Sequence, residues 1–385
     1  MARPFGVYVH FPYCAHRCPY CDFAVTTAPV PAGGRYGRAV LAELALRAAA
    51  FDGLELVSLY LGGGTPSRWA VEEVARVIAA VRARFGGAAL REVTIEANPE
   101  SCDRARLLAW REAGVNRVSI GVQSFDPGVL AQLGRRHDGE AAARAVRAAA
   151  AVLPNVSVDL IHAARRSTPL IAAADAARAV ACGAAHVSAY ALTLDPEVMA
   201  EEVPLARAAR RGLAFPGDDE AVAQARAITA ALRRAGLRRY EISNYARPGL
   251  ESVHNRLYWA GESYLGLGAG AAGCLRAGAG PIPGAAGAVR WQNLRGAEAW
   301  LAAVEAGRLP TGEEDSISPP ADRNERLMLG LRTRDGAALA GFTPAQRREA
   351  SELVRRRLAV VRGGRLVLTS RGLLLESAVA ERLFE

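Results

Sequence analysis

Residues 10–23 read His10-Phe-Pro-Tyr-Cys14-Ala-His-Arg-Cys18-Pro-Tyr-Cys21-Asp-Phe23, and they place three cysteines at the spacing C-x3-C-x2-C. A cubane iron–sulfur cluster takes four ligands, so three thiolates leave one iron open to an exogenous ligand. An open coordination position is what a reactive metal site requires. The stretch therefore indicates an iron–sulfur site that binds a second molecule.

The same cysteines could serve other purposes. A zinc ion bound by three cysteines and one histidine would take His10 or His16 as its fourth ligand, and this alternative stays open. A disulfide framework is not expected, because six cysteines are sparse in 385 residues. The remaining cysteines are isolated and are interpreted as small packed hydrophobes: Cys102, Cys182 and Cys274.

Composition indicates a globular protein. With 385 residues and 51% hydrophobic side chains, the chain can bury one large core and a smaller one. No apolar run reaches the ~18 residues of a membrane span, and no secretory signal is evident, so we expect a soluble cytoplasmic protein. The net charge is +9 and the chain has no lysine. Because the arginines are scattered along expected helices, we do not expect nucleic-acid binding.

The first two hundred residues alternate short apolar runs with amphipathic segments, which predicts βαβ units and a parallel sheet. Strands are expected at 5–10, 54–61, 93–97, 115–122, 156–161 and 186–192. Helices are expected at 35–50, 71–84, 103–113, 127–133, 140–150 and 170–182. Unusual polar residues recur at the strand ends, where barrel active sites are built. We therefore predict an α/β fold, a partial (β/α)6 TIM-type barrel.

The pattern changes near residue 195. We expect a helix at 220–235, a strand at 239–245, and a Gly/Ala/Pro-rich loop at 261–287. From about residue 294 the chain is expected to be helical again, and then to form two short strands at 359–361 and 366–369 before a final helix. This end is interpreted as a C-terminal α+β, winged-helix-like domain. The predicted division is 1–200 for the barrel, 201–293 for a capping segment and 294–385 for the C-terminal domain.

Polar residues at the expected strand ends form a candidate ligand site. Gly62-Gly-Gly-Thr-Pro66 exposes backbone groups to a ligand and is not a Walker loop, because no lysine follows. The other candidates are expected to converge on the barrel mouth: Glu96, Gln123, Arg135 and Asp159. A carboxylate suits a ribose diol or an ammonium group, and an arginine suits a carboxylate. As single residues, each of the four could instead form a structural ion pair.

Two further motifs are ambiguous. The run Gly268-Ala-Gly-Ala-Ala-Gly273 matches G-x-G-x-x-G, but neither a helix nor an acidic partner is expected after it, so we predict no dinucleotide site. His254 lies in the run His254-Asn-Arg-Leu-Tyr-Trp259. It is a candidate axial ligand for haem or, alternatively, a hydrogen-bonded structural residue.

Taken in order, these motifs resemble the HemW branch of the oxygen-independent coproporphyrinogen oxidase-like radical S-adenosylmethionine (SAM) proteins. The resemblance covers nearly the whole chain. It rests also on Tyr8-Val-His-Phe-Pro, Glu96-Ala-Asn-Pro, Ser119-Ile-Gly-Val-Gln-Ser-Phe125 and Glu241-Ile-Ser-Asn-Tyr-Ala246. It implies a [4Fe-4S] cluster on Cys14, Cys18 and Cys21, whose open iron is chelated by the amino and carboxylate groups of SAM. The implied SAM contacts are Tyr8, Tyr20, Gly63, Gly64, Thr65, Glu96, Gln123, Arg135 and Asp159.

The family resemblance implies a haem-binding chaperone that passes haem to an acceptor protein, whose identity the sequence does not indicate. The alternative is an oxygen-independent coproporphyrinogen III oxidase, an enzyme of porphyrin biosynthesis. Those oxidases carry a further cysteine where Phe23 stands and a long N-terminal extension where only thirteen residues precede Cys14. Both differences favour the chaperone, and enzyme activity is left open. A third hypothesis is a degenerate relative that keeps its cluster only for structure.

The chain also departs from the HemW pattern. Its loop after the fifth expected strand reads His162-Ala-Ala-Arg-Arg-Ser-Thr168 in place of the usual Gly-Leu-Pro-Gly-Gln-Thr, and Ala272 replaces a usual histidine. Both changes bear on haem handling more than on the cluster or SAM.

Overall fold

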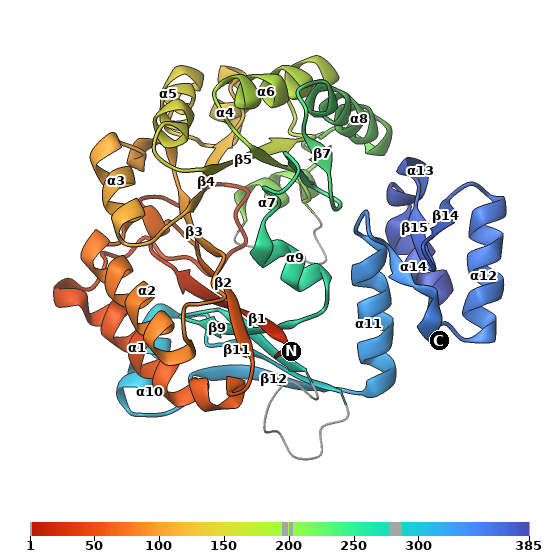
Figure 1. Ribbon diagram of the computed structural model, residues 1–385. Coiled ribbons are helices and arrows are strands. Elements are labelled where there is room, and N and C mark those ends of the chain that lie inside the picture. The colour runs from red at the N-terminus through yellow and green to blue at the C-terminus, as the bar shows by residue number, and fades with distance from the viewer. Residues whose placement is uncertain (1, 195–198, 200–202, 277–286, 385) are drawn as a thin grey trace.

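The computed structural model describes residues 2–194, 199, 203–276 and 287–384. Six parallel strands follow one another in chain order and form the centre of one curved sheet, and helices cover its outer face (Figure 1). The strands are β1 (Pro4–Phe11), β2 (Glu55–Gly63), β3 (Glu92–Ala97), β4 (Arg117–Gln123), β5 (Asn155–His162) and β6 (His186–Ala191). The predicted partial barrel of six β/α units is therefore confirmed.

The connecting helices lie close to their expected positions. They are α1 (Arg35–Arg47), α2 (Val71–Phe85), α3 (Arg104–Glu112), α4 (Pro127–Gln132), α5 (Gly139–Ala150), α6 (Pro169–Ala181) and α8 (Asp218–Arg234). Several begin at a side-chain cap that satisfies a free backbone N–H. The Asp103 carboxylate, for example, accepts a hydrogen bond from Arg106 N at 2.8 Å. An additional short helix, α7 (Pro204–Arg210), was not predicted.

Alternation along the strands separates the core from the barrel interior. On β1, the side chains of Phe5 and Phe11 are fully buried and pack against rings outside the sheet, including Phe85 of α2. The intervening Tyr8 faces the interior, where its ring lies near Tyr60 and His254. Apolar residues therefore hold the helices to the sheet, while polar residues point inward.

The sheet extends beyond the six predicted strands on both sides. Next to β1 lie β9 (Ser263–Leu267), β10 (Ala272–Arg276), β11 (Ala288–Asn293) and β12 (Thr311–Ile317); β9 is parallel to β1 and the others are antiparallel to their neighbours. The expected loop at 261–287 is thus wrong where it overlaps β9 and β10, and its part at 277–286 lies outside the described residues. Helix α10 (Ala297–Glu305) precedes β12, so the segment after 294 is not uniformly helical.

At the other edge, the expected strand at 239–245 is also wrong. The chain folds there into a hairpin of β7 (Arg238–Arg239) and β8 (Asn244–Ala246), in which Arg238 pairs with Ala246. The Glu241 carboxylate closes the turn by accepting a hydrogen bond from Ser243 N at 3.1 Å. This local polar contact forms a turn within the segment that hydropathy had predicted to be one continuous strand.

The G-x-G-x-x-G match lies in a turn between two strands. It connects β9 to β10, and no helix begins in it. Gly268 and Gly270 have positive φ angles of 99° and 73°. The glycines therefore serve a tight strand-to-strand turn, for which they supply the left-handed backbone.

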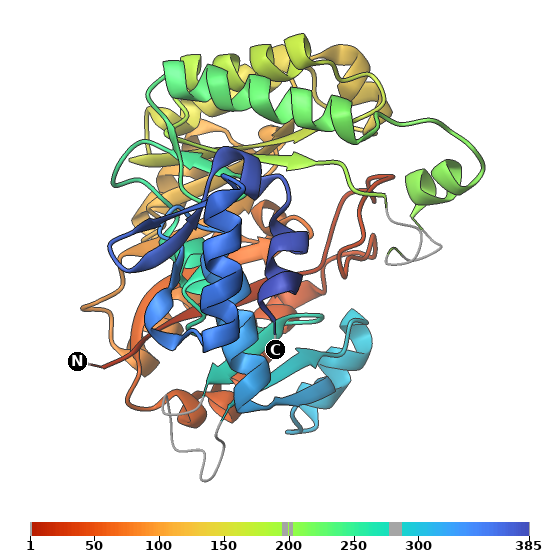
Figure 2. The ribbon, with the colours of Figure 1, turned by 90° about the vertical axis from the view of Figure 1, so that its right-hand side faces the viewer.

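The C-terminal unit has its own core. It comprises α11 (Pro319–Leu331), β13 (Ala337–Ala338), α12 (Pro344–Arg355), β14 (Ala359–Arg362), β15 (Arg365–Leu368), α13 (Ser370–Leu373) and α14 (Glu376–Leu383). The two expected strands and the final helical segment are confirmed, and a three-stranded sheet orders them as β13-β15-β14. Figure 2 shows this unit beside the barrel, where α11 packs against α9 (Val253–Trp259). Across the described ranges of both units, no helix has the length and apolar character needed to cross a membrane.

Candidate functional site

The cysteine loop follows β1 and lies at the carboxyl end of the barrel strands. Backbone hydrogen bonds fix its base: Cys14 N donates to Thr26 O at 2.9 Å, and Thr26 N donates to Pro12 O at 2.8 Å. All three cysteines are free thiols and line one cavity of about 490 Å³. The loop therefore presents three soft donors to one cavity.

The donor set fits a cubane cluster. Its three thiols line the same cavity, and thiolates are the ligands that hold iron–sulfur clusters in proteins. A zinc ion needs all its ligands on one centre, whereas a cubane takes each thiolate at a different iron. Burial raises the pKa of Cys14 and of Cys21. Both therefore remain neutral thiols until a metal replaces the proton.

The two histidines considered as zinc ligands differ in their surroundings. His10 has partners at both ring nitrogens, Tyr8 OH at 2.9 Å and Ala24 O at 2.9 Å, and does not fit as a metal ligand. His16 lies in the loop itself, with Nε2 3.8 Å from the Cys18 sulfur and 3.3 Å from Gly134 O. The zinc alternative thus depends on His16.

The glycine run packs directly against the cysteine loop. Gly63 has a φ of 112°, a conformation that favours glycine. A Cβ on Gly64 would lie 2.8 Å from the Pro12 backbone and 3.0 Å from the Cys14 sulfur. The Thr65 hydroxyl donates to that same sulfur at 3.5 Å. The absence of side chains on the glycines lets the two loops approach, which brings Thr65 to the candidate cluster.

Two carboxylates from the strands face the cavity. Tyr60 OH and Gly63 N donate to the two oxygens of Glu96 at 2.7 and 2.9 Å. The Ser119 hydroxyl lies 3.0 Å from both oxygens of Asp159. Burial raises the pKa of Glu96 to about 7 and also raises that of Asp159. Such carboxylates suit a ligand that brings hydroxyl or ammonium donors into the cavity.

Arg135 supplies the positive charge opposite these carboxylates. Its guanidinium donates to Asn98 Oδ1 at 2.7 Å and to Gly121 O at 2.8 Å, and it lies 3.5 Å from the Cys18 sulfur. Its Nε is buried and has no hydrogen-bond partner among the described residues. An arginine held in this way can receive a carboxylate beside the cysteine loop.

Gln123 has a strained backbone at the end of β4. Its φ is +67°, and the pairing of β4 with β5 shifts register between Gly121 and Gln123. A non-glycine residue in this region costs about 1–2 kcal/mol, and bulges often redirect side chains beside functional sites. The bulge turns Gln123 toward the cavity that the cysteines line.

The structure brings together every residue expected to hold the cluster or SAM except Tyr8. The cavity lining includes Cys14, Cys18, Tyr20, Cys21, Gly63, Gly64, Thr65, Glu96, Gln123, Arg135 and Asp159. Tyr8 does not line it; its hydroxyl is engaged with His10 instead. The expectation for Tyr8 therefore has no support in the geometry.

Other lining residues were not identified from the sequence. They are Tyr60, Asn98, Arg117, Ser119, Ser188 and Tyr190. The register of the strands could have identified Ser119 and Ser188. On neighbouring strands, Glu96 pairs with Ser119 and Asp159 pairs with Ser188. Residues level with an inward-facing carboxylate face inward themselves.

His254 lies on α9, at the opposite end of the barrel interior from the cysteine loop. Its Nδ1 is 2.9 Å from the Ser58 hydroxyl and its Nε2 is 3.0 Å from Tyr258 OH. The ring also stacks on Tyr60 at 5.1 Å and is 2% exposed. Burial lowers the pKa of His254 to about 3. Both ring nitrogens have partners, and the expected role of His254 as a haem ligand stays a prediction that this geometry does not support.

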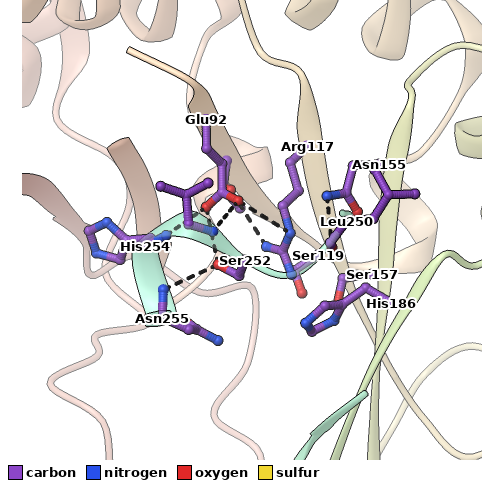
Figure 3. A network of polar contacts seen from close by, with 12 residues as sticks. Glu92, Arg117, Ser119, Asn155, Ser157, His186, Leu250, Ser252, His254 and Asn255 are labelled. Carbon is purple, nitrogen blue, oxygen red and sulfur yellow. Dashed lines mark hydrogen bonds and ion pairs between the residues drawn. The ribbon is translucent and has the colours of Figure 1, made fainter. Parts of the chain in front are cut away.

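A buried carboxylate holds this helix in place (Figure 3). Glu92, at the start of β3, accepts hydrogen bonds from Ser252 Oγ at 3.1 Å, Val253 N at 2.8 Å and His254 N at 3.2 Å. Arg117 Nε lies 4.0 Å from the same carboxylate. Glu92 thus satisfies the free N–H groups at the start of α9, which closes the lower end of the barrel.

The loop 162–168 and Ala272, where the sequence departs from the family pattern, are not among the polar residues that line the cavity of the cysteine loop. In the loop after β5, the side chain of Gln224 on α8 accepts from Ala163 N at 2.7 Å and Ser167 Oγ at 2.8 Å. Ala272 begins β10 in the sheet extension. Ala164 of the loop 162–168 packs in a small hydrophobic cluster with Tyr20, which lines the cavity.

Comparison with known proteins agrees with this geometry. The sequence model of the Radical SAM superfamily matches residues 8–166. The solved structure of coproporphyrinogen III oxidase (HemN) from Escherichia coli, a radical SAM enzyme, has a TM-score of 0.77 over 99% of this chain and 90% of that one, at 21% identity. A partial barrel with a three-cysteine loop after its first strand and a polar cavity beside it thus defines a radical SAM protein.

Similar proteins indicate which branch of the radical SAM proteins this chain belongs to. The heme chaperone HemW of Mycobacterium tuberculosis is 39% identical over 99% of this chain and 95% of its own length. HemW of Escherichia coli is 35% identical over 70% of each protein. The mitochondrial radical S-adenosyl methionine domain-containing protein 1 of Bos taurus is 36% identical over 86% of this chain and 74% of its own length. The chain belongs to the HemW family.

Proposed function

We propose that this protein is a haem-binding chaperone that carries a [4Fe-4S] cluster and SAM and delivers haem to an acceptor protein. The observation that carries the radical SAM part is the convergence of three cysteines, two buried carboxylates and one arginine on one cavity. The haem part rests on the names of the relatives that match nearly the whole chain. The free cysteines suit a reducing compartment, so we place the protein in the cytoplasm.

Each side chain has a defined task in this proposal. Cys14, Cys18 and Cys21 hold three irons of the cluster, which when bound supplies electrons and one iron with an open coordination position. Arg135 binds the SAM carboxylate, and Glu96 and Asp159 accept hydrogen bonds from its hydroxyl or ammonium groups. Gly63 and Gly64 let the backbone approach the same ligand. The side chains of Tyr20, Thr65 and Gln123 contact this ligand from the other sides of the cavity.

The oxidase alternative has less support. The likeness to coproporphyrinogen III oxidase, at 21% identity, extends to the fold alone. Phe23, which stands in place of the oxidases' additional cysteine, lines the mouth of the cavity and is 66% exposed. No thiol is available at that position, so we propose no decarboxylation of coproporphyrinogen III.

One experiment tests the proposal against its alternative. The cluster is reconstituted without air, and the same sample is assayed for haem binding by its Soret band and for coproporphyrinogen III turnover with SAM and a reductant. We expect a haem complex and no turnover. Turnover without haem binding would favour the oxidase, and the absence of both would contradict the proposal.

A further inference from the structure

A second, larger cavity lies on the outer side of the barrel. Its volume is about 1110 Å³, and it is formed between α8 and the β7–β8 hairpin on one side and β14, β15 and α13 of the C-terminal unit on the other. Strand alternation separates it from the cluster cavity: Asp159 and Tyr190 line the inner cavity, whereas His162 and Ala189 line the outer one. We call this outer cavity the interdomain groove.

His162 is unusual among the histidines of the chain. All six histidines are described, and the other five have at least one ring nitrogen within hydrogen-bonding distance of a partner. In the described part of the chain the His162 side chain has no such partner, although it is only 7% exposed and its Nδ1 is buried. Burial lowers the pKa of His162 to about 4, so the ring is neutral near pH 7. A buried imidazole without a partner requires an explanation, and a metal-bearing ligand would provide one.

The rim of the groove carries unpaired positive charge. Arg226 and Arg233 come from α8, and Arg362 and Arg371 come from the C-terminal unit. Within the described part of the chain, none of these four guanidinium groups has a hydrogen-bond or ion-pair partner. The lining carboxylate, Glu241, accepts a hydrogen bond from Ser243 N at 3.1 Å through Oε2, while its Oε1 is buried and has no hydrogen-bond partner among the described residues. Arginines arranged in this way suit a ligand that brings its own carboxylates.

The walls of the groove are largely apolar. Both sides contribute branched aliphatic side chains, and Val360 of the C-terminal unit is 40% exposed although it faces the groove. The volume lies at or slightly above the usual range of small-molecule sites, about 300–1,000 Å³. The apolar residues are Val222, Ile228, Val360, Val367, Leu368, Leu373 and Leu374. Apolar walls with a charged rim and a neutral imidazole match a flat amphiphile with a metal at its centre.

We propose that the interdomain groove is the haem site, with His162 as the axial ligand and the rim arginines facing the two propionate carboxylates. This inference rests on the proposed haem-chaperone function and assigns its location. A ring nitrogen of His162 donates its lone pair to the haem iron, and no electron is transferred. The haem would lie across β5 and β6 from the cluster cavity, with the barrel and the C-terminal unit each supplying one wall.

Haem titrations of the full-length, cluster-loaded protein test the site. We expect His162→Ala to shift the Soret band and to remove the histidine-ligated signal from the EPR spectrum of the ferric complex, and added imidazole to restore both. His254→Ala is the matched histidine control and should keep the wild-type haem spectrum. Rescue by imidazole separates a lost ligand from a misfolded protein.

The rim is tested with a second probe. The double variant Arg233→Glu with Arg371→Glu should bind haem at least about tenfold more weakly, since two charge-assisted hydrogen bonds are lost. The same variant should bind haem dimethyl ester, which lacks free carboxylates, as the wild type does. Arg104→Glu changes an exposed arginine at the start of α3, on the far side of the barrel (Figure 1), and should leave haem affinity unchanged.

The outcomes separate the site from the function. If the wild type binds no haem, the proposed function fails. If the wild type binds haem but His162→Ala keeps its spectrum, or if the double variant loses haem and its ester equally, the groove is not the site while the function stands. Loss of the signal in His254→Ala alone would place the haem in the barrel interior instead.

Discussion

Single residues at the cysteine loop decide whether a cluster forms. Changing Cys14, Cys18 or Cys21 to alanine should abolish the cluster, because each thiolate binds a different iron. Iron and sulfide analysis of protein prepared without air should give about four irons for the wild type and close to none for each variant. Cys182→Ala, at a buried cysteine at the end of α6, is the control and should keep its iron. Stoichiometric zinc without sulfide would contradict the assignment.

Glu96 should make stability depend on pH. Its pKa is about 7 in the folded protein and 4.5 ordinarily, because burial disfavours the carboxylate. A raised acid pKa means that the folded state binds the proton more tightly, so this contribution is complete below pH 4.5 and is lost as pH rises through about 7. Between these limits the wild type should lose about 3 kcal/mol of unfolding free energy relative to Glu96→Gln.

Denaturant unfolding of both proteins at pH 5 and pH 8 measures this difference. Asp159, whose pKa is also raised by burial, is present in both proteins and cancels in the comparison. If the free energy of unfolding changed equally with pH in the wild type and in Glu96→Gln, Glu96 would have an ordinary pKa.

At the scale of elements, the contact between the glycine run and the cysteine loop is the critical packing. Gly64→Ala would place a Cβ 2.8 Å from the Pro12 backbone, and backbone cannot move aside as a flexible side chain can. We expect a cost of about 1–3 kcal/mol and a lower iron content, because the cysteine loop must shift. Thermal unfolding and iron analysis measure the two effects.

Gly341→Ala is the matched control, since a Cβ there meets no atom within 4 Å and its φ is not positive. It should leave both stability and iron content unchanged. Equal iron content in Gly64→Ala and the control would show that the two loops do not depend on this contact.

At the scale of the whole molecule, the described residues form two large hydrophobic cores that share no residue. The larger lies between the barrel sheet and its helices, and the smaller joins residues of α11, α12, β15 and α14. Leu353 is fully buried in the smaller core. Changing it to alanine should lower the free energy of unfolding of this core by about 2–5 kcal/mol. Calorimetry of Leu353→Ala should therefore show a lowered C-terminal transition, while the cluster absorbance persists to the wild-type temperature.

A single transition that moves together with the loss of the cluster would show instead that the two cores unfold as one unit. The matched substitution in the larger core is Leu107→Ala on α3, which should lower the temperature at which the cluster is lost. The predicted division at residues 200 and 293 stays a prediction.

The amino-acid sequence by itself determined the six β/α units, the cysteine loop and a core set of the residues that line its cavity. These features depend on local patterns: apolar periodicity places the strands and helices, and polar residues at strand ends must meet at one edge of a parallel sheet. Cys14, Glu96 and Asp159 could therefore be grouped from the order of the strands alone.

Only the tertiary structure decided the features that depend on contacts between distant segments. The strand β9 exists because it pairs with β1, more than 250 residues earlier in the chain, although it lies in a stretch that the sequence predicted to be a loop. The surroundings of a histidine depend on its neighbours: His254 has two partners, whereas His162 has none among the described residues and faces a groove between two units. Hydrogen-bond partners across such distances are set by the packing of the whole chain, which local sequence does not encode.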